Sequence, residues 1–151
     1  MLRLGRAAVT AAAVLAVCLL APVAARAEIV VTVDKAKQRM FVMVDGEHRY
    51  TWPVSTGLGN TPSGSYRPQV LSRNHRSTLF NNAPMPYAIF YSGHYAIHGT
   101  TAVAQLGSRA SKGCVRLHPS NAAALFALVQ QHGPANTRIL IQDSVTRVAQ
   151  R

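Results

Sequence analysis

The sequence predicts a mostly β protein with one main helix, a minor α+β variant of the all-β class. Two runs rich in β-branched residues follow one another near the start of the chain, and a third lies near its end. An Asp45-Gly46 pair separates two such runs and is a strong signal for a β-hairpin. One stretch after residue 118 carries clear helical periodicity. We therefore expect strands to form most of the core and a helix to cover it.

The first third of the chain predicts a β-meander. Asp45-Gly46 would turn the second strand into the third, and Pro53 places the third strand at a sheet edge or bends it. A turn over residues 34–37 would join the first two strands. The three strands are expected at residues 28–33, 38–44 and 48–55.

The middle of the chain is less regular. Residues 56–65 are dense in glycine, proline and serine, which is typical of a loop, and the glycine spacing matches no phosphate-binding loop. A short strand is expected over 66–71, and the polar stretch 73–86 predicts an irregular flap or rim. Two further strands, 87–91 and 95–98, would be joined at Ser92-Gly93-His94.

The end of the domain predicts a helix and a final strand. Residues 119–131 place Leu125, Leu128 and Val129 on one helical face, with Ser120 as the expected cap. Gly133-Pro134 would end this helix. Residues 137–142 (T-R-I-L-I-Q) then predict a strand.

Residues 1–27 predict a cleaved secretory signal peptide. A short basic start is followed by an apolar run over residues 7–20 and by the small-x-small pattern Ala25-Arg26-Ala27. The alternative is a retained membrane anchor, because residues 7–25 are near the lower length limit for spanning a bilayer. Pro22 and the cleavage pattern favour removal. Residues 28–151 would then form one exported domain in the periplasm or cell envelope, with no stable membrane insertion.

The charge of the chain favours anionic partners. Three of the sixteen basic residues lie in the predicted signal, which leaves thirteen basic and five acidic residues, a net charge of +8, in residues 28–151. A surface of this sign raises the encounter rate with anions. Outside the cytosol we expect an anionic envelope polymer and no nucleic acid as the partner.

The distribution of acidic residues excludes several kinds of active site. No carboxylate lies between Glu47 and Asp143. A glycosidase needs two carboxylates that flank the scissile bond, and a Ser-His-Asp relay needs one. Calcium and magnesium sites also depend on carboxylate ligands. The sequence therefore predicts chemistry without a metal or another cofactor.

Cys114 and His98 are the candidate reactive residues. Without the signal, Cys114 is the only cysteine of the chain, so no internal disulfide accounts for it. A nearby imidazole can take the thiol proton, and the charges of Lys112 and Arg116 would favour thiolate. Gly113 would allow a tight approach, and backbone N–H groups around it are candidate oxyanion donors.

Two other interpretations of these residues remain open. Cys114 could be a buried, inert thiol, with His98 a hydrogen-bonded structural histidine. A zinc site could also combine Cys114 with His94, His98 or His118, although hydrolytic zinc sites usually recruit a carboxylate base.

The segments Y-A-I-H-G-T (95–100) and S-K-G-C-V-R-L (111–117) closely resemble the signature of the L,D-transpeptidases, the YkuD-like peptidoglycan enzymes. Three further segments carry the same resemblance, so that it covers nearly all of residues 28–151: D-K-A-K-Q-R-M-F-V at 34–42, P-V-S-T-G with T-P-S-G-S-Y at 53–66, and P-M-P-Y at 84–87. Many family members carry histidine where this chain has Lys112, which puts a second imidazole in doubt.

The resemblance implies a β-sandwich catalytic domain over residues 28–151 and a cysteine acyl-enzyme. Cys114 would attack an L-centre to D-centre peptide bond of a peptidoglycan stem peptide, with His98 as general base and then acid. The Gly99 carbonyl would orient the imidazole, and a neighbouring stem would accept the acyl group in a 3→3 cross-link. Carbapenem-type inhibitors are expected to acylate the thiol. The resemblance also suggests residues that line the substrate cleft: Arg116, His94, Tyr87, Met85 and Ser111.

Two alternatives to cross-linking follow from the same residues. Water as acceptor would make an L,D-carboxypeptidase or a hydrolase of wall-to-protein links. An inert Cys114 would leave a non-catalytic module that binds the cell wall.

Overall fold

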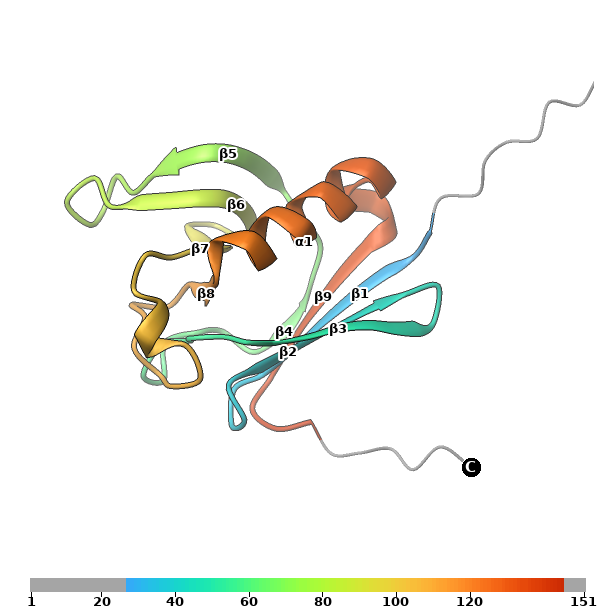
Figure 1. The fold of residues 1–151 in the computed structure, drawn as a ribbon, viewed down its shortest axis with the longest axis horizontal. Helices are drawn as coiled ribbons and strands as arrows, with labels where there is room; N and C mark the ends of the chain where they lie inside the picture. The colour runs from blue at the N-terminus through green and yellow to red at the C-terminus, as the bar shows by residue number, and fades with distance from the viewer. Residues whose placement is uncertain (1–26, 146–151) are drawn as a thin grey trace, which may run out of the picture.

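The computed structural model describes residues 27–145, and the predicted signal peptide lies outside them apart from Ala27. Two β-sheets form the frame of the domain, and one helix packs beside them (Figure 1). The first sheet has the strand order β3 (Glu47–Pro53), β2 (Arg39–Val44), β1 (Ile29–Asp34), β9 (Thr137–Gln142), β4 (Gly64–Tyr66). The second has the order β5 (Val70–Arg76), β6 (Pro84–Ser92), β7 (Tyr95–Gly99), β8 (Val115–Leu117). The predicted mostly β sandwich with one main helix is confirmed.

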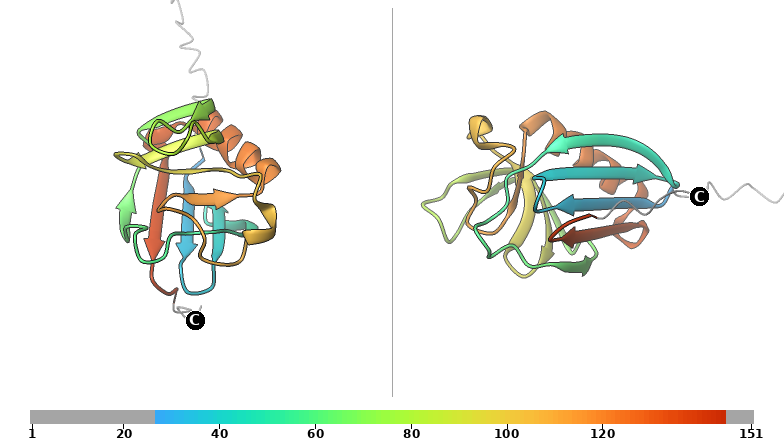
Figure 2. Two further views of the ribbon diagram at one scale, coloured as in Figure 1. Left: turned by 90° about the vertical axis from the view of Figure 1, so that its left-hand side faces the viewer. Right: turned by 90° about the horizontal axis from the view of Figure 1, so that it is seen from below.

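Four strands of the first sheet form close to where the sequence predicts them, whereas β4 does not. Strands β1, β2 and β3 are a meander, and β9 returns to pair in parallel with β1 (Figure 2). Asp45 and Gly46 have φ values of 51° and 77°, the left-handed pair that a tight hairpin turn requires. The edge position of β3 agrees with Pro53, which cannot donate a ladder hydrogen bond.

The core lies between the sheets and α1 (Pro119–His132). The helix packs against β6 and β7 and reaches β1 at its end (Figure 1). Its buried residues include Leu125 and Val129, which share a core with Ile29, Val31 and Ile139 of the first sheet. No helix of residues 27–145 is long and apolar enough to cross a membrane.

Three local predictions are wrong. Residues 66–71 are not one strand: Tyr66 ends β4 in the first sheet, and Val70 begins β5 in the second. Pro68 lies between them and has no N–H for either ladder, so the chain crosses from sheet to sheet there.

Half of the stretch 73–86 is strand, because β5 runs to Arg76 and β6 starts at Pro84, and residues 77–83 form the turn between them. The residues of β5 in this stretch are polar because β5 is an exposed edge strand. The helix cap is His118, whose Nδ1 accepts a hydrogen bond from the Ser120 N–H at 3.2 Å. Ser120 lies inside the first turn.

Candidate active site

His98 and Cys114 line one cavity of about 350 Å³. His98 belongs to β7, and Cys114 directly precedes β8. These two strands pair in parallel with His98 opposite Arg116. Residues two apart in a strand share a face, so the imidazole, the thiol and the guanidinium approach the cavity from one side of the sheet. Met85, Phe80 and Lys112 also contribute to the cavity wall.

His98 is buried, with 6% of its surface exposed, and its ring has a fixed orientation. Its Nδ1 lies 2.7 Å from the Gly99 carbonyl oxygen. A carbonyl only accepts hydrogen bonds, so Nδ1 carries the proton in this contact and Nε2 presents a lone pair. This is the tautomer that a general base needs.

Burial lowers the pKa of His98 to about 4, and the charge of Arg116 acts in the same direction. The hydrogen bond to Gly99 opposes this shift only in part. The imidazole is therefore neutral at physiological pH.

Cys114 is half-buried, and its Sγ donates to the His94 carbonyl oxygen at 3.8 Å. Burial raises the pKa of the Cys114 thiol, although a backbone hydrogen bond from Ala96 and the charge of Arg116 lower it in part. The thiol and the imidazole are therefore both favoured in their neutral forms.

The two cations that flank the thiol in sequence act differently in space. Arg116 lies on the cavity wall and its Nη1 approaches Gln105 Oε1 at 3.4 Å. Lys112 directs its ammonium to the ring of Phe80, at 4.6 Å from the ring centroid. Phe80 belongs to the turn between β5 and β6, so this cation–π contact joins that turn to residues 111–114, which carry Cys114.

The segment before Cys114 is held by its own hydrogen bonds. The Ser111 hydroxyl donates to the Cys114 carbonyl at 2.5 Å and accepts from the Gly113 N–H at 3.1 Å. Gly113 has φ = 127°, and a side chain there would meet the Tyr95 ring at 2.7 Å. With the Gly113 N–H engaged by Ser111, the Cys114 N–H is the remaining candidate oxyanion donor of the two.

The structure separates the other predicted cleft residues. Met85 lines the cavity, but Tyr87, His94 and Ser111 are not part of its wall. Tyr87 has φ = 55°, which breaks the alternation of β6, and its ring packs 5.8 Å from that of Phe126 on α1. The His94 ring stacks 4.4 Å from the ring of Tyr95.

The loop 55–63, called the support loop below, contacts residues 111–114. The sequence predicted only a loop here. The Thr61 hydroxyl donates to the Gly113 carbonyl at 2.8 Å, and Asn60 Nδ2 donates to the Lys112 carbonyl at 3.0 Å. Gly57 passes so close that a Cβ there would lie 2.9 Å from the Gly113 nitrogen. The T-P-x-G segment was the one available signal for this role.

Among residues 27–145, no group of three histidine, cysteine or acidic side chains could hold a metal ion. His118, one of the candidate ligands, instead has its Nδ1 2.7 Å from the Ser120 hydroxyl at the start of α1. The zinc interpretation has no geometric support in this part of the chain.

A family model described as the YkuD L,D-transpeptidase catalytic domain matches residues 28–143. The chain belongs to this family. YkuD of Bacillus subtilis (strain 168) is 31% identical over 97 residues, which cover 60% of this chain and 52% of that protein. The chain thus spans about half the length of this relative.

Solved structures show the same fold. An L,D-transpeptidase from Mycobacterium smegmatis superposes with a TM-score of 0.69 at 23% identity, over 77% of this chain and 59% of that one. The L,D-transpeptidase LdtMt1, solved in complex with imipenem, gives a TM-score of 0.68 at 21% identity, over 77% and 59% of the two chains. The mostly β, two-sheet architecture is therefore that of L,D-transpeptidase domains.

Proposed function

We propose that this L,D-transpeptidase domain forms 3→3 cross-links between peptidoglycan stem peptides through a thioester on Cys114. The observation that carries the proposal is the shared cavity of His98 and Cys114, in which the Gly99 carbonyl fixes the imidazole tautomer. Membership of the family supports a peptidoglycan substrate, and we take the donor to be a stem peptide with an L-centre to D-centre bond.

In the first half-reaction, Cys114 Sγ attacks the carbonyl carbon of that bond. The thiol proton passes to Nε2 of His98 as the S–C bond forms, and the carbonyl oxygen becomes an oxyanion. When the intermediate collapses, the C–N bond breaks and His98 returns the proton to the leaving amine of D-alanine. The product is a thioester on Cys114, and His98 is again a neutral imidazole.

In the second half-reaction, an amine of a neighbouring stem attacks the thioester carbonyl. His98 accepts a proton from that amine, the S–C bond breaks, and the proton returns to Sγ. The enzyme ends as a thiol and a neutral imidazole, with one peptide bond broken and one formed. Arg116 on the cavity wall is suited to hold a substrate carboxylate.

One observation favours a second candidate, an L,D-carboxypeptidase that uses water as acceptor. The cavity wall contains two cations, Lys112 and Arg116, and none of its described residues is acidic. An acceptor in its ammonium form is repelled by this field, whereas water is not. Hydrolysis of wall-to-protein links would use the same site.

The decisive experiment incubates the purified domain with tetrapeptide muropeptides and resolves the products by mass. Cross-linked dimers support transfer, and tripeptide without dimers supports the carboxypeptidase. Cys114→Ala should abolish both products while the thermal unfolding profile is retained. We also expect imipenem to add its mass to the wild type and not to Cys114→Ala, as the complex of LdtMt1 with imipenem suggests. Wild type without product and without adduct would leave the non-catalytic wall-binding module.

A further inference from the structure

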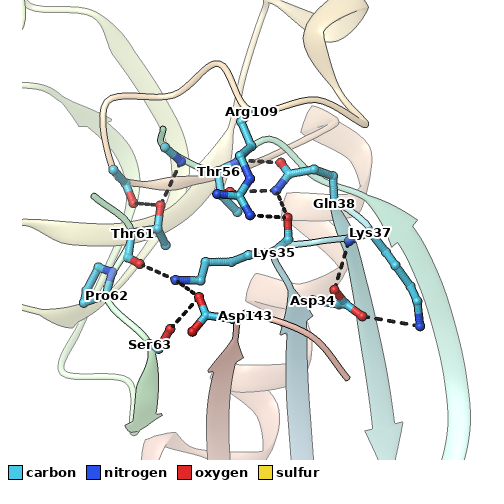
Figure 3. Close-up of polar contacts among 12 residues, drawn as sticks. Asp34, Lys35, Lys37, Gln38, Thr56, Thr61, Pro62, Ser63, Arg109 and Asp143 are labelled. Carbon is cyan, nitrogen blue, oxygen red and sulfur yellow. Dashed lines mark hydrogen bonds and ion pairs between the residues drawn. The ribbon is translucent and has the colours of Figure 1, made fainter. Parts of the chain in front are cut away.

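We propose that Lys35 is a positioning residue for residues 111–114. It would act through Thr61 on the peptide unit that precedes Cys114. The inference rests on the proposed function. Lys35 lies in the turn between β1 and β2 of the first sheet, whereas Cys114 directly precedes β8 of the second. Figure 3 shows Lys35 extending from that turn toward Thr61 and Asp143.

Lys35 is held in an environment that lysine rarely occupies. Only 7% of its surface is exposed, and removing an ammonium from water is costly unless it is fully paired. Its Nζ donates to the Thr61 carbonyl oxygen at 3.0 Å and lies 2.8 Å from Asp143 Oδ1 (Figure 3). A surface-facing lysine would satisfy the same carboxylate without burial, so the contact that requires burial is the one to Thr61.

Thr61 carries the contact onward to the reactive segment. While its carbonyl accepts from Lys35, its hydroxyl donates to the Gly113 carbonyl and accepts from the Gly57 N–H, both at 2.8 Å. The Gly113 carbonyl belongs to the same peptide plane as the Cys114 N–H, the candidate oxyanion donor. Fixing this carbonyl fixes the direction of that N–H.

A second set of hydrogen bonds from the same turn reaches Ala110 and Ser111 through Thr56. Gln38 Nε2 donates to the Lys35 carbonyl and to the Thr56 hydroxyl, both at 2.7 Å, and Gln38 Oε1 accepts from the Thr56 N–H at 2.8 Å. The Thr56 carbonyl accepts from the N–H groups of Ala110 and Ser111, at 3.0 and 3.1 Å. The turn therefore contacts the support loop at two points.

The C-terminal end of β9 anchors the turn. The N–H groups of Lys35 and Ala36 donate to the carbonyls of Gln142 and Asp143, each at 2.9 Å. The hydrogen bond and charge of Lys35 hold the pKa of the Asp143 carboxyl below its usual value, so this carboxylate stays ionised at neutral pH. Asp143 also accepts from the Ser63 hydroxyl at 3.3 Å, which ties the support loop to the same carboxylate.

The test measures imipenem acylation of the domain, separating the limiting rate of acylation from the apparent affinity. Lys35→Met removes the donor and keeps the length of the side chain. We expect its limiting rate to fall by about tenfold or more with little change in affinity, since small misplacements of reacting groups cost rate. Lys37→Met is the matched control, because Lys37 pairs with Asp34 from the exposed side of the same turn, and its rate should equal that of wild type.

A double-mutant cycle distinguishes positioning from general stabilisation. Thr61→Val removes the hydroxyl and should also lower the limiting rate, whereas Thr61→Ser should retain most of it. Because Lys35 acts through Thr61, the double variant should lose no more rate than Thr61→Val alone. Additive losses, or a wild-type rate in Lys35→Met, would overturn the inference.

Two further measurements keep the inference testable in every case. If Lys35→Met does not fold, Asp143→Asn removes the negative charge that pairs with Lys35, and an unchanged limiting rate in that variant counts against the proposal. Amide hydrogen exchange over residues 111–114 does not depend on acylation. We expect it to be faster in Lys35→Met and unchanged in Lys37→Met, and equal exchange in both rejects the proposal even if the wild type is not acylated.

Discussion

The two sheets of this domain are built on different principles. In the first sheet, the buried residues of β1 and β9 alternate with less buried ones along most of each strand, and their inner face is apolar apart from Thr137 at the start of β9. In the second, β5 is largely exposed, while β7 is buried from Ala96 to Gly99 and contains His98. Both sheets contribute to the apolar core, and the second sheet also places a titratable group, His98, inside the fold.

We expect this difference to separate substitutions that lower only the free energy of unfolding from those that also slow acylation. His98 lies in β7, which pairs with β8 over only three residue pairs, and Cys114 directly precedes β8. Outside this ladder, the isolated bridges Ser55–Arg116 and Gly57–Ser111 add backbone pairing to the same segment. A substitution in one sheet should thus change a different quantity from the same substitution in the other.

The largest contrast is expected between two histidines, one in each sheet. Among the residues that the structure describes, His98 is the one imidazole on the cavity wall. We expect His98→Ala to slow acylation by imipenem by about 10²- to 10⁴-fold, the usual contribution of a general base. His48→Ala, on the exposed edge strand β3, should leave the rate unchanged. The measurement is the time course of adduct mass. Equal rates for the two variants would remove the general base from the mechanism.

A matched pair of core substitutions sharpens the comparison. Ile139 in β9 and Ile97 in β7 are both about 1% exposed. Truncating either to alanine should lower the free energy of unfolding by about 2–5 kcal/mol, through lost burial and a residual cavity. Only Ile97→Ala should also slow acylation at a temperature well below unfolding, because Ile97 directly precedes His98 and pairs with Val115.

Denaturant unfolding and acylation kinetics on the same samples decide this point. If Ile139→Ala slows acylation as much as Ile97→Ala, the two sheets do not divide stability and chemistry as proposed.

The sequence predicted the first sheet better than the second for a physical reason. The strands β1, β2 and β9 bury an apolar face, so their sequences carry the alternation of apolar residues that predicts a strand. The strands β4 and β8 have three residues each, and tertiary pairing alone stabilises them. The polar residues of β5 gave no strand signal, because an edge strand with little burial leaves none.

The same division applies to the site. His98 and Cys114 could be singled out because chemistry requires those residue types, and neighbouring glycines mark a tight approach. Lys35, Gln38 and Thr61 could not, because two of their contacts reach backbone carbonyls 26 and 52 residues away. A backbone partner leaves no trace in the identity of the residue that is contacted.

The pH dependence of acylation should be the smallest effect. Burial lowers the pKa of His98 to about 4 and raises that of the Cys114 thiol. The neutral pair therefore persists from about pH 5 to pH 8, and the rate should be nearly flat across this range. A histidine with its ordinary pKa near 6.5 would lose about tenfold in rate by pH 5.5.

Folding stability should follow the same group with a definite sign. Because the pKa of His98 is lower in the folded state than in the unfolded chain, the unfolded chain binds more protons between about pH 6.5 and pH 4. The contribution of neutral His98 is thus complete above pH 6.5 and is lost as pH falls toward 4. His98→Gln should flatten this part of the stability curve, measured by thermal unfolding. An acid limb of acylation centred near pH 6.5 in the wild type would show that the imidazole is solvated and that the second sheet does not enclose it.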